Sequence, residues 1–156
     1  MGTDHLLVVA LLDGWRCGLE LGAVVEVVSA VETTPLPKAP DVVMGVVSVR
    51  GEILPVVDVR SRFRLPPRAV RPSDRFLVAR SRTRHLVLPL DDVVGVTEVG
   101  DDGIVTPGTV VPGLELLRGI ARCDDGLILI HDLDAFLSLE EDEALGEALR
   151  PVPEVG

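Results

Sequence analysis

Short apolar segments separated by polar turns run through the whole chain. Each segment holds about four to eight residues, and valine is the commonest residue type. Side chains branched at Cβ pack well on a pleated sheet and lose rotamer freedom in a helix, so we predict strands. Their close spacing is typical of a small β-barrel or sandwich. The predicted strands are Leu6–Leu12, Val24–Val31, Val46–Val49, Ile53–Val59, Phe76–Ala79, Leu86–Leu90, Val93–Val99, Ile120–Cys123 and Leu127–Ile130.

Turns rich in glycine and aspartate separate several of these segments. Glycine adopts the positive φ angle that a tight hairpin requires, and aspartate favours turns. We therefore expect hairpins at four places: Asp13–Gly14, Arg50–Gly51, Gly100–Gly103 and Asp124–Gly126.

Signals for helices are fewer. A helical turn is expected over Asp41–Met44, and Asp58 and Asp132 are each expected to begin another. A terminal helix is predicted over Leu139–Leu149, because Pro151 prevents its continuation.

The second half of the chain repeats the apolar pattern of the first half. Offsets of 69 and then 74 residues give these matches: Leu7–Ala10 with Phe76–Ala79, Val24–Val27 with Val93–Val96, Gly45 with Gly119, and Asp58 with Asp132. Such a repeat implies two similar subdomains. We predict pseudo-repeats at about 6–63 and 75–139, followed by an acidic helix and tail over 140–156. A chance match of two valine-rich stretches is the alternative.

Units of about 70 residues lie near the lower limit for an independent hydrophobic core. We therefore expect the two subdomains to be intertwined in a single domain over 1–156, sharing burial at their junction or exchanging strands. A groove lined by valine and leucine would then form between them and suit an apolar helix tip or strand of a partner.

Charge is distributed unevenly along the chain. The net charge is −10, which argues against nucleic acid as a partner because a polyanion would be repelled. Nine arginines nevertheless fall within 60–84, while the carboxyl end is strongly acidic. The arginines indicate either a solvated surface or a surface for an acidic partner.

No apolar run is long enough to cross a bilayer, so we expect no membrane insertion. The first apolar segment lacks a preceding Lys or Arg, which argues against a secretory signal and favours a cytoplasmic location. Cys17 and Cys123 are expected to be reduced residues rather than a disulfide.

Catalytic motifs are not evident. His131 and Asp132 are adjacent, but neighbouring residues of a strand point to opposite faces, and no serine or cysteine lies in a nucleophile motif. We therefore predict that His131 lies at the edge of the core. The cysteines and histidines lack metal-ligand spacing, and no phosphate-binding loop is present, so neither catalytic residue, metal nor cofactor is expected. A small enzyme or nucleic-acid module on a barrel fold is the remaining alternative.

The segment VVMGVVSVRGEILPVVDVRSRF resembles the signature of the CheW-like chemotaxis coupling proteins. The resemblance extends from about Leu6 to Leu139. It implies a mainly β fold of two SH3-like five-stranded β-barrel subdomains with short helical turns and a C-terminal helix. It also implies an adaptor without catalysis, which couples the cytoplasmic tip of a methyl-accepting chemoreceptor to the regulatory domain of the histidine kinase CheA.

The resemblance also implies which residues contact the partners. The receptor-binding positions are Val24, Glu26, Val27, Arg50 and Gly51. The kinase-binding positions are Leu21 and Gly45.

Structural roles compete with these assignments. Arg50 is either a partner contact or a turn residue that forms an internal ion pair with Glu26 or Asp58. Simple packing is the alternative for Leu21 and Gly45.

Two departures from the family pattern affect the expected function. Ser48 stands where the family commonly has asparagine, and Pro89 lies inside a predicted strand, where proline is tolerated at an edge or bulge. A specialised relative that binds one partner, and so modulates the signalling array instead of coupling it, is therefore the alternative function.

Overall fold

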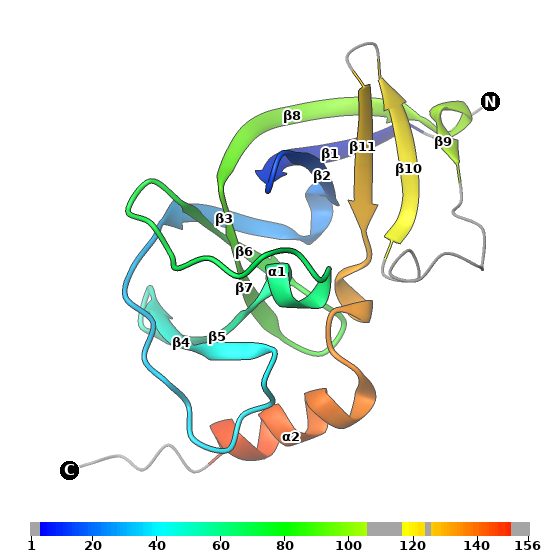
Figure 1. The fold of residues 1–156 in the computed structure, drawn as a ribbon. Helices are drawn as coiled ribbons and strands as arrows, with labels where there is room; N and C mark the ends of the chain where they lie inside the picture. The colour runs from blue at the N-terminus through cyan, green and yellow to red at the C-terminus, as the bar shows by residue number, and fades with distance from the viewer. Residues whose placement is uncertain (1–3, 106–116, 124–125, 151–156) are drawn as a thin grey trace.

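The strands of the protein form two sheets (Figure 1). The computed structural model describes residues 4–105, 117–123 and 126–150. The strands are β1 (Asp4–Leu12), β2 (Trp15–Glu20), β3 (Val24–Ser29), β4 (Val43–Val49), β5 (Glu52–Val57), β6 (Arg75–Arg80), β7 (His85–Leu90), β8 (Asp92–Gly100), β9 (Ile104–Val105), β10 (Leu117–Cys123) and β11 (Gly126–His131). The helices are α1 (Val59–Arg62) and α2 (Leu139–Leu149), with 3-10 turns at Leu21–Ala23, Asp101–Gly103 and Leu133–Ala135.

The two sheets exchange strands between the halves of the chain. One sheet has the order β8-β1-β2-β11-β10-β9, and the other has the order β3-β6-β7-β5-β4. The offsets that align the halves relate β1 to β6, β2 to β7, β3 to β8, β4 to β10 and β5 to β11. Strands related in this way occupy equivalent places in the two sheets. The β1–β2 hairpin of the first half therefore lies in the sheet that is otherwise built from the second half. The β6–β7 hairpin of the second half lies in the sheet that is otherwise built from the first half.

Strands β1 and β6 are buried on both faces, which accounts for their unbroken apolar sequences. In β1, Leu7 and Val9 pack into a cluster of the six-stranded sheet, whereas Val8 and Ala10 pack into a cluster shared by the two sheets. Strand β6 divides its residues in the same way between a cluster of the five-stranded sheet and the shared cluster.

The junction between the sheets is filled by this shared cluster. Leu19 reaches it from β2, Leu77 from β6, Leu88 from β7 and Leu145 from α2, and all four side chains are buried. The expectation of an open apolar groove at the centre of the junction is therefore corrected. Inward-facing residues of both sheets bury one another there, because subdomains of about 70 residues lie near the lower limit for independent cores.

The predicted mainly β architecture is confirmed, with two differences in detail. The first sheet contains a sixth strand, β9, which pairs with β10. In the described part of the chain, no ladder joins the end strands of either sheet, so the barrels are not closed. Thr34 forms an isolated bridge to Val46 instead and occupies part of the free edge of β4.

Two of the predicted hairpins have the expected left-handed turns. Residues 13 and 14 have φ angles of 52° and 83°, and residues 50 and 51 have φ angles of 50° and 81°. The hairpin expected at Gly100–Gly103 is wrong, because these residues form a 3-10 turn after which β9 pairs with β10. The fourth predicted turn includes residues 124–125, which lie outside the described residues.

The predicted helical turns have mixed outcomes. Asp58 accepts a hydrogen bond from Ser61 N and begins α1, and Asp132 caps its 3-10 turn in the same manner. The helical turn expected over Asp41–Met44 is wrong, because β4 already begins at Val43, which is buried against the shared cluster.

Pro89 lies in β7, opposite Phe76 of β6. The other neighbour of β7 is β5, whose parallel pairing is at Val56 and Val87. Since β5 ends at Val57, Pro89 lies past the end of that neighbour. This local edge is the position at which a missing N–H group is tolerated.

Several arginines of the 60–84 segment pair with acidic groups of the chain itself. Arg62 contacts both carboxylate oxygens of Glu141, at 2.7 and 2.8 Å, and Arg84 Nε donates to Asp142 at 2.7 Å. Glu141 also accepts from Ser138 N in a capping box at the start of α2. The acidic carboxyl end is thus one partner of the basic segment.

Replacing Glu141 with glutamine is expected to lower the free energy of unfolding by about 1 kcal/mol. Burial alone would raise the pKa of Glu141, but the Ser138 N–H and the Arg62 guanidinium lower it below its ordinary value. The charged form is therefore the stabilising one. Urea denaturation measures the loss, and Glu143→Gln, an exposed neighbour, is the matched control. Equal stability of the two variants would contradict a role for this ion pair.

A second cluster of charges joins α1 to two turns. Arg60 is 9% exposed and donates to Asp13 at 3.2 Å and to Asp91 at 2.8 and 3.1 Å. Asp91 also accepts from Arg68, which in turn contacts Asp74. Burial alone would raise the pKa of Asp91, but the Asp13 N–H and the two guanidiniums lower it. Ion pairs therefore hold the basic segment to the rest of the protein near both of its ends, at Arg60 and at Arg84.

Candidate protein-interaction site

Strand β3 and the tip of the β4–β5 hairpin are joined by an ion pair. Arg50 Nε lies 2.7 Å from Glu26 Oε2, and the Arg50 side chain remains 81% exposed. Since β3 and β4 are the two end strands of the five-stranded sheet, this pair brings the ends together. Glu26 and Arg50, with the adjacent Gly51, therefore lie close together, and their role in receptor binding stays a prediction.

Arg50 occupies a backbone conformation that suits few side chains. Its φ angle of 50° lies in the left-handed region, where glycine, asparagine and aspartate are favoured. A long charged side chain at this position costs free energy without being required by the turn. Such a residue is a candidate for function.

The carboxylate of Glu26 has one free acceptor. Its Oε2 binds Arg50, whereas Oε1 is buried and accepts no hydrogen bond within the described part of the protein. Buried acceptors are usually satisfied, so this oxygen is suited to a donor from outside the chain.

The valines of β3 divide between its two faces. Val24 is half-buried and packs against the shared core cluster, whereas Val27 is 39% exposed. Val25, which the resemblance did not single out, is 50% exposed. The alternation of the strand could have identified it, because residues two apart share a face.

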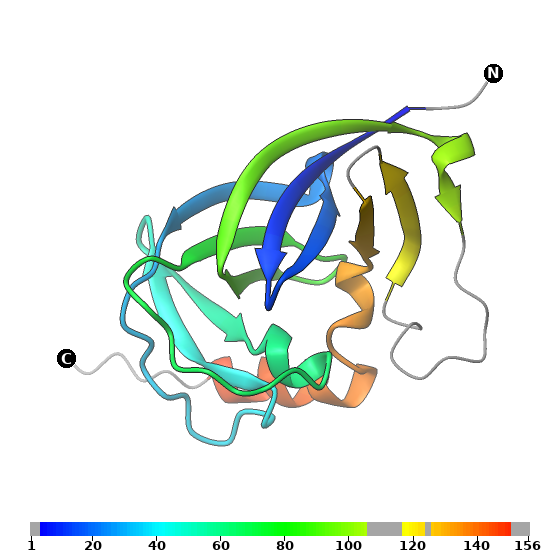
Figure 2. The ribbon, with the colours of Figure 1, turned by 45° about the horizontal axis from the view of Figure 1, so that its top comes forward.

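Strand β8 presents the same exposed pair on the other sheet. Val94 and Val96, which the offset of 69 relates to Val25 and Val27, are 58% and 57% exposed. Strand β8 is an end strand like β3, and Figure 2 shows it running beside β1 along one side of the molecule. The repeat predicted from the sequence could have identified these two residues as counterparts of Val25 and Val27.

Leu21 and Gly45 lie far apart along the sheet order. Leu21 precedes β3 and is 38% exposed, whereas Gly45 is buried in β4 at the opposite end of the sheet. A Cβ atom on Gly45 would lie 2.3 Å from the carbonyl oxygen of Thr34. The absence of a side chain at this position therefore has a packing reason.

The histidine and cysteine singled out from the sequence are buried. His131 contacts the rings of Phe63 and Phe136, with centroid distances of 4.6 and 5.7 Å, and burial lowers its pKa to about 4. Burial also raises the pKa of Cys17 to about 12. Within residues 4–105, 117–123 and 126–150, no group of three potential ligands could hold a metal ion, and no helix is long and apolar enough to cross a membrane.

The fold is a two-sheet β architecture with exposed side chains on the end strands β3 and β8 and on the hairpin residue Arg50. Residues 5–141 match the CheW-like domain family. The chemotaxis protein CheW of Rhizobium meliloti (strain 1021) is 32% identical over 147 residues, covering 92% of this chain and 93% of the relative. The chemotaxis protein CheW of Treponema pallidum (strain Nichols) is 25% identical, covering 82% of this chain and 79% of the relative.

A solved structure is similar over most of its length. The crystal structure of scaffolding protein TtCheW from Thermoanaerobacter tengcongensis matches with a TM-score of 0.81 and 28% identity, covering 89% of this chain and 96% of that chain. The chain belongs to the CheW-like family. It is a chemotaxis scaffold that couples receptors to CheA, and the family is non-catalytic.

Proposed function

We propose that this scaffold couples its partners by holding the cytoplasmic tip of a methyl-accepting chemoreceptor and the regulatory domain of CheA in a fixed orientation. A conformational change of the receptor then alters the kinase without any reaction in the scaffold itself. The chain acts in the cytoplasm, is attached to receptor arrays through its partners, and uses neither a cofactor nor nucleic acid.

The receptor tip binds the surface formed by Val24, Glu26, Val27, Arg50 and Gly51. The single observation that carries this proposal is the exposed Arg50 guanidinium, held by Glu26 on a turn that favours smaller residues. Arginine offers a rigid set of donors to carboxylates and carbonyls of a partner.

Apolar contact supports the same surface. Val25 and Val27 flank Glu26 in β3 and are 50% and 39% exposed, so they add apolar surface that a partner could cover. The kinase regulatory domain contacts the surface near Leu21, whose exposed side chain is available. Gly45 contributes to kinase binding separately, through the Thr34 segment that it allows to approach β4.

Replacing Arg50 with alanine is expected to weaken receptor-tip binding by about tenfold. The free energy of unfolding should change by less than about 1 kcal/mol, because the Arg50 side chain is 81% exposed and exposed ion pairs contribute little to stability. Binding is measured by titrating the purified receptor tip and the CheA regulatory domain in separate experiments. CheA binding should be unchanged.

Two further variants sharpen this test. Arg50→Asn suits the left-handed turn, so it should retain full stability while losing receptor binding. Arg122→Ala removes an exposed arginine of β10 and should leave both affinities unchanged. A large loss of stability with Arg50→Asn, or normal receptor binding, would make Arg50 a structural residue.

The alternative function is that of a relative that binds one partner. Ser48, which stands exposed in β4 two residues before Arg50, is the departure that favours it. Wild-type protein that binds the receptor tip but shows no affinity for the CheA regulatory domain would establish this alternative.

A further inference from the structure

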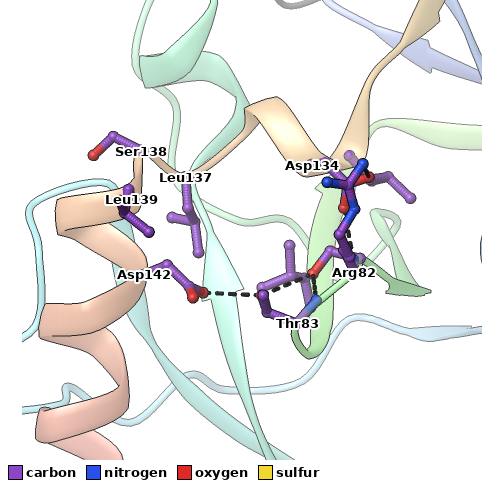
Figure 3. Close-up of a pocket in the computed structure, with 10 residues that line it drawn as sticks. Arg82, Thr83, Asp134, Leu137, Ser138, Leu139 and Asp142 are labelled. Carbon is purple, nitrogen blue, oxygen red and sulfur yellow. Dashed lines mark hydrogen bonds and ion pairs between the residues drawn. The ribbon is translucent and has the colours of Figure 1, made fainter.

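A cavity of about 230 Å³ lies between the β6–β7 turn and the beginning of α2, away from the residues assigned above (Figure 3). Four leucines line it, Leu86, Leu133, Leu137 and Leu139, of which the first two are buried, and the rest of its lining is polar. This volume is large enough to admit one bulky aliphatic side chain. The cavity therefore has the size and the lining of a socket for a single residue.

The walls of the cavity are held in place by hydrogen bonds. Asp142 of α2 accepts from Thr83 Oγ1 at 3.1 Å and from Arg84 Nε at 2.7 Å. Asp134 accepts from the backbone N–H of Arg82 at 2.6 Å. Figure 3 shows Asp142 of α2 facing Thr83 of the turn, with Asp134 beside Arg82. A preformed socket of this kind loses little entropy when it is filled.

The mouth of the cavity carries an apolar residue that the fold does not use. Leu139, the first residue of α2, is 75% exposed, which is the highest value among the large apolar side chains of the described chain. Every other position in this first turn is acidic. A leucine at the rim of an apolar socket enlarges the apolar surface that a partner could cover.

The helix side of the rim is negatively charged, whereas Arg82 on the turn side is exposed and lies 3.7 Å from Asp134. Glu140 and Glu143 are exposed beside Leu139, and they make no ion pair with the described residues. Asp142 and Asp134 are already bound to the turn, so their contacts do not compensate these two glutamates. The complement of this surface is an apolar side chain with positive charge next to it.

We propose that this socket binds a short segment of a partner protein that inserts one bulky aliphatic side chain and places a lysine or arginine against Glu140 and Glu143. This docking position is additional to the receptor and kinase surfaces and does not depend on them. The two parts have separate tasks, since the aliphatic side chain fills the cavity and the basic residues select the segment by charge.

Peptide titration followed by methyl NMR of the full-length protein tests this proposal. The probe is the peptide acetyl-Gly-Lys-Leu-Lys-Gly-amide, compared with peptides that carry alanine in place of leucine or glutamate in place of both lysines. The first peptide should shift the methyl signals of Leu137 and Leu139 saturably. Both comparison peptides should bind at least about fivefold more weakly, and added salt should weaken the first.

Protein variants complete the test. Leu139→Ser and the double change Glu140→Gln, Glu143→Gln should each weaken the peptide by about fivefold. Leu127→Ser, which alters an exposed leucine of β11, should have no effect. Equal binding of all three peptides, the absence of saturable shifts, or an affinity unchanged by Leu139→Ser would overturn the proposal. Methyl shifts that depend on protein concentration would assign the socket to a second copy of the chain and would also overturn it.

Discussion

Alanine at position 45 is expected to lower the free energy of unfolding by about 3 kcal/mol. The new Cβ atom would lie 2.3 Å from the Thr34 carbonyl oxygen and 2.8 Å from the Thr34 carbonyl carbon, both of which belong to the backbone. The φ angle of 150° at this position also disfavours a side chain. Relief requires the Thr34 segment to leave β4, which breaks two hydrogen bonds to Val46.

Chemical denaturation of Gly45→Ala measures this loss. Gly22→Ala is the matched control, because a Cβ atom there meets nothing within 4 Å, so its stability should be nearly unchanged. A stable Gly45→Ala protein with weakened CheA binding would show that position 45 contacts the kinase directly. Loss of stability together with loss of binding would show that it acts through the Thr34 segment.

Acidification from pH 6.5 to about pH 4 is expected to remove about 3 kcal/mol of stability through His131. The unfolded chain protonates this imidazole near its ordinary pKa of 6.5, whereas burial lowers the pKa in the folded protein to about 4. The unfolded state therefore binds more protons within this interval. Stability from this residue is complete above pH 6.5 and declines as the pH falls.

Denaturation midpoints measured across this pH interval test the role of His131. His131→Phe should remove most of the decline, because phenylalanine retains an aromatic ring beside Phe63 and Phe136 but does not titrate. His5 acts in the opposite direction, since its hydrogen bonds to Asp101 and Glu20 raise its pKa. A His5→Gln background removes that contribution. An undiminished decline in His131→Phe would contradict the prediction.

Local patterns predicted the strands well, but long-range pairing was less accessible. The alternation and turn residues located the two left-handed hairpins at residues 13–14 and 50–51. The strands that exchange between the halves could be identified only from the structure, because β1 pairs with β8, about 90 residues further along the chain. The duplication of the two halves stays a prediction, supported by the equivalent positions of the related strands.

Charge was harder to interpret than hydrophobicity. The arginines of 60–84 suggested a solvated surface or an acidic partner, and the sequence contained no distance between them and the acidic end. In the structure Arg62 and Arg84 contact α2, while Arg60 is nearly buried. The ion pair of Arg50 with Glu26 was one of the structural alternatives considered from sequence, and it is present. The exposed positions of Val25, Val94 and Val96 could be identified only once the structure showed which face of each strand is exposed.

The reciprocal exchange of hairpins has a consequence for the order in which the protein can mature during translation. The β1–β2 hairpin leaves the ribosome first, but its lateral neighbours are β8 and β11. Strand β11 ends at His131, so the earliest hairpin must wait for most of the polypeptide before its ladder is complete. A nascent chain arrested before β10 would still lack β11 and would therefore expose the β2 edge of that hairpin. Acquisition of protease resistance is expected late in synthesis and in one step.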